Sequence, residues 1–364
     1  MKILVASNLY PSKDYKALGV FVKNFIIELD EIGLDYDTVF INLKKGKVNK
    51  LISYLVYFLK FIFKGIFSKY DILYIHYVSH NALPALIVKF FRRNVKIYAN
   101  AHGSDVMPQT KTQARMQKYV QKLLGKADKI IVPSNYFMEL VSERFGISKD
   151  KFRMYPSGGI NNEVFRPIEI DDDFYNKYQL DKDKKYIGFV SRIAEGKGWD
   201  VFLNAMNKVV QSNKLEDLDA LIVGNGEQQK EFLQMIEDLG LKNRVKYIEQ
   251  VPQTELAKLY NVMEVFVFPT SRVSESLGLV GIEAMATKTN IIVSDVAAPK
   301  YIVDDGVNGF KFEVNNSEKL YETILKYFSL NEVEKERLSD NAYTTATKYF
   351  RENIREELKD ILAN

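Results

Sequence analysis

The sequence predicts an α/β protein made of two Rossmann-like domains that face each other across a cleft. Three observations predict this class. A chain of 364 residues is too long for one ordinary hydrophobic core. Short apolar runs alternate with longer helical patterns twice along the chain, which is typical of parallel sheets covered by helices on both faces. Between the two series, residues 156–174 combine Pro, Gly and Asn with an acidic run, as expected of a linker.

The first half contains five strand candidates separated by helical patterns. The apolar runs cover residues 3–6, 38–41, 72–75, 95–99 and 129–132, and helical patterns cover residues 20–32, 81–91 and 136–145. The second half repeats the alternation, with strand candidates at residues 186–190, 220–223, 245–248, 265–268 and 290–293, and a charged helical pattern over residues 332–362. Ligands of such sheets bind beyond the carboxyl ends of the strands, so the segments after the strands are the candidate sites.

Composition excludes several classes of protein. The chain has no cysteine, which excludes disulfides, thiolate catalysis and thiolate zinc sites and fits a reducing cytoplasm. The apolar run at residues 1–6 is too short for a signal peptide, so we expect a cytoplasmic protein. The net charge of +4 hides an asymmetry, because residues 1–168 hold 26 Lys+Arg and 13 Asp+Glu whereas the remainder holds 25 and 34. The basic half indicates an anionic partner, which could be nucleic acid, an anionic membrane surface or a diphosphate-bearing substrate.

The most informative segment runs from Glu275 to Glu283, with Gly278 and Gly281 between the two acids. It follows a strand candidate and leads into a helical pattern. A helix N-terminus offers unpaired N–H groups and a positive dipole end, which suit a phosphate. Carboxylates accept hydrogen bonds from sugar hydroxyls. The segment therefore has the groups that a nucleotide-sugar site needs.

Two further loops follow strand candidates of the second half. Gly224-Asn-Gly226 is half of a dinucleotide fingerprint, but Gln229 stands where the third glycine belongs, so a hydride-transfer cofactor is not expected. A plain strand-to-helix turn explains these glycines equally well. The second loop, residues 191–198, is not a Walker loop, yet Arg192 and Lys197 flank a glycine turn where a helix begins, which suits a diphosphate. The alternative is a solvated loop with ordinary surface cations.

The chain has three histidines, His76, His80 and His102. His102 begins the segment His102-Gly-Ser-Asp105 at the carboxyl end of a strand candidate, which would face the predicted cleft. A lone histidine is more often a structural residue. His76 and His80 are four residues apart, but no third ligand accompanies them, so we expect structural roles and no metal site.

Two segments have a charge pattern that needs interpretation. The acidic run at residues 171–173 lies among other charged residues and is interpreted as solvated rather than metal-binding. Residues 51–67 are apolar and aromatic but are interrupted by Lys60 and Lys64, and lysines 44, 45, 47 and 50 precede them. This pattern fits an interfacial helix on anionic lipid. A helix packed on the sheet of the first domain fits equally well.

Taken together, these segments resemble the retaining glycosyltransferase family 4, whose members have the two-domain GT-B fold. The resemblance covers nearly the whole chain. It is carried by residues 8–19, His102-Gly-Ser-Asp105, residues 156–161 with Phe165 and Pro167, Ser191-Arg192 with Lys197-Gly198, Gly224-Asn-Gly226 and the segment from Glu275 to Ala286. The order and spacing of the segments are specific for the family and not for its substrate.

The resemblance implies a set of residues around the donor diphosphate. Arg192 and Lys197 would bind it and take up charge on the leaving group. Gly19 would let the first loop approach the phosphates, and the backbone amides of Leu279 and Val280 would hold the diphosphate at the helix start. Further residues implied to line the nucleotide-sugar site are Ser191, Gly224, Gly226 and Gly278.

The resemblance also implies roles around the sugars and the base. Glu283 would hold the ribose hydroxyls and Glu275 the sugar that is transferred. His102 would contact that sugar near the reacting carbon. The backbone around Val251 and Pro252 would receive the base.

The activity implied is transfer of a hexose from a nucleotide-diphosphate sugar, of the UDP or GDP type, to a glycan or polyprenyl-diphosphate-linked acceptor in cell-surface polysaccharide synthesis. The reaction would need no metal or cofactor. Residues 1–167 would form the acceptor-side domain and residues 168–345 the donor domain, with a last helix at about 346–364 packing back on the first domain. Peripheral contact with an anionic membrane, at the inner face of the plasma membrane, is expected, and no nucleic-acid partner is.

The sequence departs from the family pattern at three places. Residues 287–290 are Thr-Lys-Thr-Asn, where the family has a small residue followed by Gly and Pro, and Ala297-Ala298 replaces a common Gly-Gly pair. Ser157 stands where Asn is usual.

Two other classes of protein stay open at this point. One is a nucleotide-sugar epimerase or phosphorylase on the same fold, and the other is a non-catalytic nucleic-acid binder that uses the basic half.

Overall fold

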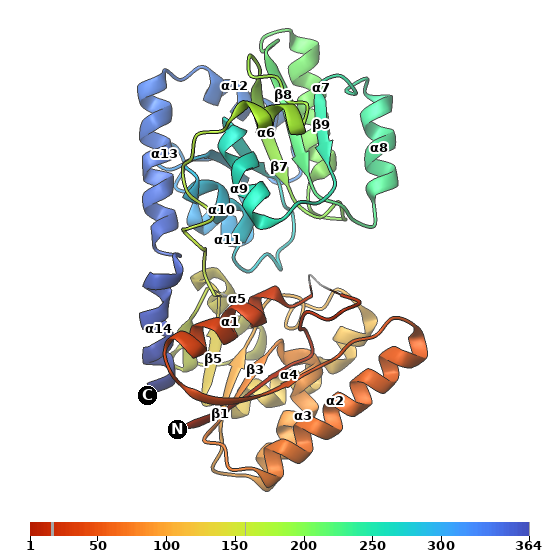
Figure 1. Ribbon diagram of the computed structural model, residues 1–364, viewed down its shortest axis with the longest axis vertical. Coiled ribbons are helices and arrows are strands. Elements are labelled where there is room, and N and C mark those ends of the chain that lie inside the picture. Colours follow the sequence, from red (N-terminus) through yellow and green to blue (C-terminus); the bar gives the residue numbers. More distant parts are fainter. Residues whose placement is uncertain (16–17, 157, 364) are drawn as a thin grey trace. The chain divides into compact units, whose positions relative to one another are not determined.

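The structure is a computed structural model that describes residues 1–15, 18–156 and 158–363. Contacts divide the chain into two compact units, Met1–Gly159 with Ile354–Asn364, and Ile160–Asn353. The predicted fold class is confirmed, because each unit is a Rossmann-like domain with one parallel six-stranded sheet and helices on both faces (Figure 1). Three residues named above, Lys16 and Ala17 of the first loop and Ser157, lie outside the described residues.

The first domain has the strand order β2-β1-β3-β4-β5-β6. Its strands are β1 (Lys2–Ser7), β2 (Asp35–Phe40), β3 (Ile72–His76), β4 (Lys96–Asn100), β5 (Lys129–Val132) and β6 (Phe152–Met154). Its helices are α1 (Val20–Glu31), α2 (Lys47–Phe67), α3 (Val78–Phe91), α4 (Lys111–Lys126), α5 (Asn135–Phe145), a 3-10 turn at Lys149–Lys151, and α14 (Arg351–Ala363).

The second domain has the strand order β12-β11-β10-β7-β8-β9. Its strands are β7 (Lys185–Val190), β8 (Leu218–Val223), β9 (Val245–Ile248), β10 (Val265–Phe268), β11 (Asn290–Ser294) and β12 (Phe310–Phe312). Its helices are α6 (Asp172–Lys177), α7 (Trp199–Ser212), α8 (Gln229–Asp238), α9 (Gln253–Val262), α10 (Leu279–Ala286), α11 (Ala297–Ile302), α12 (Ser317–Phe328) and α13 (Glu332–Thr347).

The central strands are apolar along their middle positions because both faces of each sheet are covered. In β1, Leu4 and Ala6 belong to the core beneath α2–α5, whereas Ile3 and Val5 belong to the core formed with α1 and α14. The sheet of the second domain also has a separate core on each face. This explains why the strands could be predicted from continuous apolar runs rather than from alternation.

The boundary between the domains differs from the one expected at residues 167 and 168. The second unit begins at Ile160, because Ile160 and Phe165 pack in a core of the second domain. The charged pattern at residues 332–362 contains two helices, α13 and α14, and the chain returns to the first unit at Ile354. There, Ile354 and Leu358 are fully buried against the first sheet.

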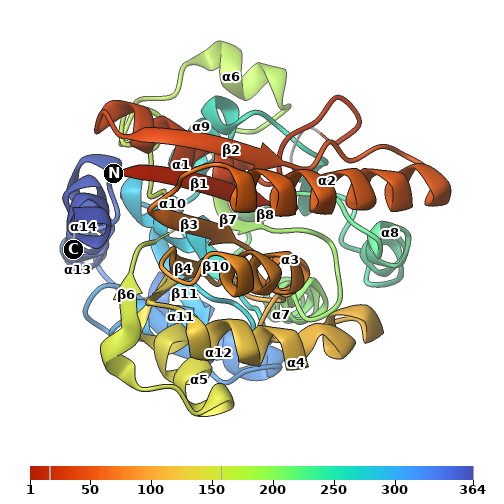
Figure 2. The same cartoon turned by 90° about the horizontal axis from the view of Figure 1, so that it is seen from below.

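No helix in the described part of the chain is long and apolar enough to cross a membrane. Helix α2, with 21 residues, packs against β2 and α3 (Figure 2).

Candidate active site

The loops after β7 and β8 pack directly against each other, and glycine makes this possible. A Cβ atom on Gly224 would lie 1.8 Å from the carbonyl oxygen of Ser191, and one on Gly226 would lie 2.2 Å from that of Ile193. The backbone hydrogen bond from Ile193 N–H to the Asn225 carbonyl, 3.0 Å long, joins the two loops. The close packing of the two loops therefore requires glycine at both positions, in agreement with the interpretation of this segment as a strand-to-helix turn.

A pocket of about 270 Å³ opens at the carboxyl ends of β7 and β8, where ligands of parallel sheets bind. It brings together five of the predicted site residues, Ser191, Arg192, Gly224, Val251 and Val280. The remaining lining residues are Val190, Val223, Asn225, Glu249, Gln250 and Leu256. Residues from the carboxyl ends of two strands, from the loops after three strands, from α9 and from the start of α10 thus converge on one cavity.

The N-terminus of α10 has free amide groups. Gly278 caps the helix in a left-handed conformation, with φ of 79°, and no side-chain cap hydrogen bond is present among the residues that the structure describes. The N–H groups of Leu279 and Val280 have no hydrogen-bond partner within the described residues, whereas the N–H of Gly281 bonds to the Gly278 carbonyl at 2.9 Å. Unpaired amides at a helix start attract anions. Val280 also lines the pocket, so these amides lie beside it.

Lys197 and Glu275 form an ion pair of 2.6 Å between Nζ and Oε2, and both side chains are largely shielded, at 15% and 18% exposed. Gly198 ends the lysine loop as the cap of α7, and a Cβ there would lie 2.0 Å from the Pro269 carbonyl oxygen. The loops after β7 and β10 are therefore fixed against each other. Neither Lys197 nor Glu275 lines the pocket, so the structure places this pair outside the cavity.

Arg272, in the loop after β10, was not singled out from the sequence. Its Nε donates to the Glu195 carbonyl at 2.8 Å. Its pKa is lowered by burial first and then by the positive charge of Arg192, so the two guanidinium groups are neighbours. Arg192 has no carboxylate within 4.0 Å among the described residues. The signal available in the sequence was the position of Arg272 after the carboxyl end of a central strand.

Glu283 lies inside α10 and is 8% exposed. Burial raises the pKa of its carboxyl group from 4.5 to about 8, and the Tyr260 hydroxyl donates to it at 3.4 Å. Glu283 is thus a neutral acid at pH 7, able to donate as well as accept a hydrogen bond. The two acids of the predicted segment differ physically, because Glu275 pairs with Lys197, whereas in the described part of the chain no cation lies within 4.0 Å of Glu283.

His102 lies in the first domain, after β4, and it contacts His76 at the end of β3. Their atoms His76 Nδ1 and His102 Nε2 are 3.1 Å apart. Burial lowers the pKa of His102 to about 3, and burial followed by the nearby His102 lowers that of His76 well below 6.5. Both imidazoles are therefore neutral at pH 7. The backbone around them is held by Asp105, which is fully buried and accepts the N–H of His102 at 3.1 Å.

The contacts of His76 indicate which ring nitrogen carries its proton. His76 Nε2 is buried and has no partner among the described residues. A proton there would be a buried donor without an acceptor, and orphaned donors are rarer than under-satisfied acceptors. The favoured tautomer therefore has the proton on Nδ1, from which it is donated to His102 Nε2. In a neutral His102 the proton then lies on its own Nδ1.

Gly19 caps α1 and has φ of 71°, which favours glycine. A Cβ there would lie 2.4 Å from the Leu9 carbonyl, so the first loop closes on itself at this residue. Two residues later, the ring of Phe21 lies 4.3 Å from that of His102. Gly19 and His102 are thereby connected through the start of α1.

The remaining sequence candidates have structural explanations. The three aspartates at residues 171–173 are exposed, as expected of a solvated acidic run. The Asp171 carboxylate accepts the Phe174 N–H at 2.8 Å and caps α6, so the run begins a helix and not an irregular linker. His80 Nδ1 lies 3.1 Å from the Ser79 hydroxyl, and its ring stacks on Tyr54. Within the described residues no three His, Asp or Glu side chains come together as a metal site would require.

The chain was compared with known families and proteins. Residues 29–158 match the model of the family described as Glycosyltransferase Family 4, and residues 171–345 match Glycosyl transferases group 1. An uncharacterised glycosyltransferase of Methanocaldococcus jannaschii is 27% identical over 96% of this chain and 94% of its own length. A D-inositol 3-phosphate glycosyltransferase of Corynebacterium urealyticum is 23% identical over 66% of this chain and 58% of its own length.

Solved structures agree on the fold. HepE of Anabaena, crystallised with UDP, superposes with a TM-score of 0.78 at 17% identity over the whole of both chains. A sucrose-phosphate synthase of Thermosynechococcus elongatus gives a TM-score of 0.78 at 19% identity, over all of this chain and 98% of its own. The chain belongs to the GT-B glycosyltransferases of the family 4 type.

Proposed function

We propose that this glycosyltransferase transfers a hexose, with retention of anomeric configuration, from a nucleotide-diphosphate sugar to a glycan or lipid-linked acceptor in cell-surface polysaccharide synthesis. One observation carries the proposal. Free amides at the start of α10 lie beside a pocket that Arg192 lines, and Arg272 neighbours Arg192. This combination of cations and amides fits a diphosphate. HepE was also crystallised with UDP-glucose, which supports a UDP-type donor, although a GDP-type donor fits the pocket chemistry too.

In the proposed reaction the bond between the sugar C1 and the diphosphate oxygen breaks, and a bond from C1 to the acceptor oxygen forms on the same face. Negative charge builds up on the leaving diphosphate, which also takes the proton of the acceptor hydroxyl. Arg192, Lys197 and the amides of Leu279 and Val280 stabilise that charge. The ion pair with Glu275 and the helix backbone hold Lys197 and the amides in place before the reaction begins. The proposed mechanism uses no metal or cofactor.

The two acids bind hydroxyls in the proposal. Glu275 holds the transferred hexose, and the ion pair with Lys197 keeps its carboxylate in place. Glu283 holds the ribose, and its raised pKa lets it donate as well as accept a hydrogen bond. Val251, in the lining of the pocket, contacts the base through its backbone. His102 contacts the hexose near C1 as a neutral imidazole.

The acceptor side of the proposal rests on the first domain. Its basic charge favours an anionic acceptor such as a polyprenyl-diphosphate-linked glycan, held at the inner face of the plasma membrane. We propose peripheral contact of this domain with an anionic membrane, in a cytoplasmic protein.

The test is a thermal-shift panel with UDP-, GDP- and ADP-sugars, followed by product analysis by mass spectrometry with and without a lipid-linked acceptor. We expect one nucleotide to stabilise the protein and the mass of the acceptor to rise by one hexose. Arg192→Ala, Lys197→Ala and Glu275→Gln should each lower turnover by about 100-fold, in the range of lost transition-state contacts. Lys230→Ala and Glu231→Gln, exposed on α8, are the matched controls and should leave it unchanged.

Four outcomes would reject the proposal. Near-normal turnover in all three site variants would separate the chemistry from this site. An altered donor sugar without acceptor transfer would indicate an epimerase, and phosphate-dependent release of a sugar phosphate would indicate a phosphorylase. Salt-sensitive DNA binding that no nucleotide sugar affects would favour the nucleic-acid binder.

A further inference from the structure

Helix α2 presents an apolar stripe to solvent along its whole length. Each of its eight side chains lies three or four residues from another one, the spacing of one helix face, and each is between 44% and 72% exposed. They are Val48, Leu51, Ile52, Leu55, Val56, Leu59, Phe63 and Phe67. Continuous apolar surface of this extent marks an interaction site rather than ordinary surface variation.

The stripe is held in place by the opposite face of α2. Tyr57 and Phe61 are buried there, and the Tyr57 hydroxyl donates to Asn81 at 2.6 Å. A Cβ on Gly65 would lie 2.7 Å from a methyl group of Val88, so only glycine lets α2 approach α3 this closely. The interpretation of residues 51–67 as a packed helix and the interpretation as an exposed amphipathic helix are thus compatible, because each describes one face.

The end of α3 extends the apolar surface. Arg92 donates to the carbonyl groups of Ile66 at 3.3 Å and Ser68 at 2.7 Å, which ties the end of α3 to the end of α2. The adjacent Phe90 and Phe91 are 70% and 62% exposed. Four phenylalanine rings therefore lie on the exposed surfaces of the two joined helix ends.

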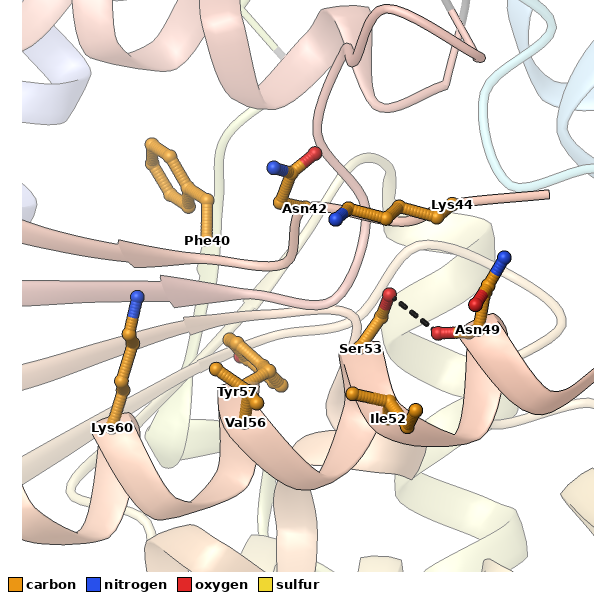
Figure 3. Close-up of a pocket in the computed structure, with 9 residues that line it drawn as sticks. All are labelled: Phe40, Asn42, Lys44, Asn49, Ile52, Ser53, Val56, Tyr57 and Lys60. Atoms are coloured by element: carbon orange, nitrogen blue, oxygen red, sulfur yellow. Dashed lines mark hydrogen bonds between the residues drawn. The ribbon is translucent and has the colours of Figure 1, made fainter.

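A pocket of about 340 Å³ lies beside the stripe, between α2 and the loop after β2 (Figure 3). Lys44 from that loop and Lys60 from α2 line two sides of it, and Ile52 and Val56 of the stripe line another. The other lining residues are Phe40, Asn42, Asn49, Ser53 and Tyr57. Within the described residues, neither lysine has a carboxylate within 4.0 Å, whereas Lys64, one turn after Lys60, pairs with Asp37 at 3.2 Å. The pocket thus combines two uncompensated cations with amide and hydroxyl groups.

The charge of this segment identifies the partner. Between Asp37 and Asp71 the sequence has seven lysines and no acidic residue. A second copy of the chain docked through the same face would place these lysines against each other, because a two-fold interface is self-complementary. An anionic bilayer attracts them and also accepts the apolar stripe at the boundary between headgroups and acyl chains.

We propose that α2 and the end of α3 dock on an anionic phospholipid bilayer, with the stripe among the acyl chains and a lipid phosphate in the pocket between Lys44 and Lys60. This inference rests on the proposed function, because a lipid-linked acceptor would lie in the same bilayer. It identifies the docking face and a headgroup site separate from the donor pocket.

The test is sedimentation with vesicles of phosphatidylcholine alone or mixed with phosphatidylglycerol, carried out without donor or acceptor. We expect binding only with phosphatidylglycerol. The double change Leu55→Ser and Leu59→Ser should abolish it. Lys44→Gln with Lys60→Gln should weaken it at least fivefold more than Lys45→Gln with Lys47→Gln, a pair of equal charge outside the pocket, since one lysine near such a surface is worth about fivefold.

Several results would overturn the proposal. Unchanged vesicle binding of the Ser variant would show that the stripe does not contact the bilayer. Equal losses of binding for the two Gln pairs would show that the pocket does not bind a lipid phosphate. Displacement from vesicles by millimolar glycerol phosphate would assign the pocket to a free phosphate instead of a lipid. A dimer in light scattering that the Ser variant abolishes would assign the stripe to a second copy.

The docking face and the transferase activity can fail separately. Hydrogen exchange of amides in β1 and β3 shows whether the first domain of each variant is folded, and it needs no donor binding. Vesicle binding without any transferase activity would refute the proposed function alone, whereas transfer to a detergent-dispersed acceptor without vesicle binding would refute the docking face alone.

Discussion

At the scale of single residues, the structure adds a partner to His102. The sequence singled out His102 and assigned His76 a structural role, yet the two rings are hydrogen-bonded. Parallel pairing of β3 with β4 places His76 opposite Asn100, two residues before His102. The order of neighbouring strands, which a single sequence does not reveal, is what brings these histidines together.

Glu283 makes the stability of the second domain dependent on pH. Its folded pKa of about 8 exceeds its ordinary value of 4.5, so between these values the folded state holds a proton that the unfolded state has lost. The contribution of this proton to the free energy of unfolding is complete below about pH 4.5 and is lost as the pH rises toward 8. Over this range the free energy of unfolding falls by up to about 1.4 kcal/mol per pH unit. Glu283→Gln should remove this dependence. Trp199, the single tryptophan, reports urea unfolding of this domain at about pH 6 and pH 8.5.

The control for this measurement is Glu231→Gln, an exposed acid on α8, which should keep the pH dependence of the unchanged protein. A Gln variant at position 283 with the same slope as the unchanged protein would show that another group titrates.

At the scale of elements, the backbone is strained at two of the positions where the sequence departs from the family pattern. Lys288 and Ala297 stand where glycine is usual, and both have positive φ, of 61° and 53°. The backbone thus keeps a left-handed conformation that costs a non-glycine residue roughly 1–2 kcal/mol. The sequence identified both positions as unusual, but the conformation was needed to show what the substitution costs.

Ala297→Gly should therefore stabilise the protein by about 0.5–1 kcal/mol, because the relief of strain exceeds the added entropy of glycine in the unfolded chain. Differential scanning calorimetry measures the shift. Ala298→Gly is the matched control one residue later, without positive φ, and it should lower stability. Equal losses of stability in the two variants would show that the backbone at Ala297 is not strained.

The sequence predicted the strands better than the helices. Buried strands show as apolar runs, whereas α4 is largely polar and was not predicted, although its capping box of Thr110 and Gln113 is visible as a start signal. In the site, single loops could be identified from glycines and cations. Ion pairs such as Lys197 with Glu275 depend on which strands are neighbours in the sheet, so these pairs could not be predicted from the sequence.

At the scale of the whole molecule, the fold class was predictable and the path of the chain only in outline. The last helix completes the core of the first domain, where the Arg355 guanidinium contacts Glu28 at 2.8 Å. Glu28 is 1% exposed, so its carboxylate depends on this partner. Removing one member of such a pair is costly because a buried charge stays behind.

Arg355→Ala should therefore destabilise the first domain by about 2–3 kcal/mol, less than for a fully buried pair because the arginine is partly exposed. Hydrogen exchange of amides in β1 and β3 measures the effect. Glu28→Gln in the same chain should recover part of the loss, while Trp199 fluorescence shows the second domain unchanged. Full protection of the β1 and β3 amides in Arg355→Ala would contradict the role of the pair.

The return of the chain to its first domain has a consequence for biosynthesis. The chain passes between the two units near Ile160 and again near Ile354. The segments beside these two points are hydrogen-bonded to each other, since Ile160 donates its N–H to the Tyr349 carbonyl and accepts the N–H of Arg351. A ribosome delivers the contiguous segment Ile160–Asn353 before the final helix. The second domain can therefore finish folding on the nascent chain while the first still exposes the surface that Ile354 and Leu358 will cover. The domain that is translated first is the last to be completed.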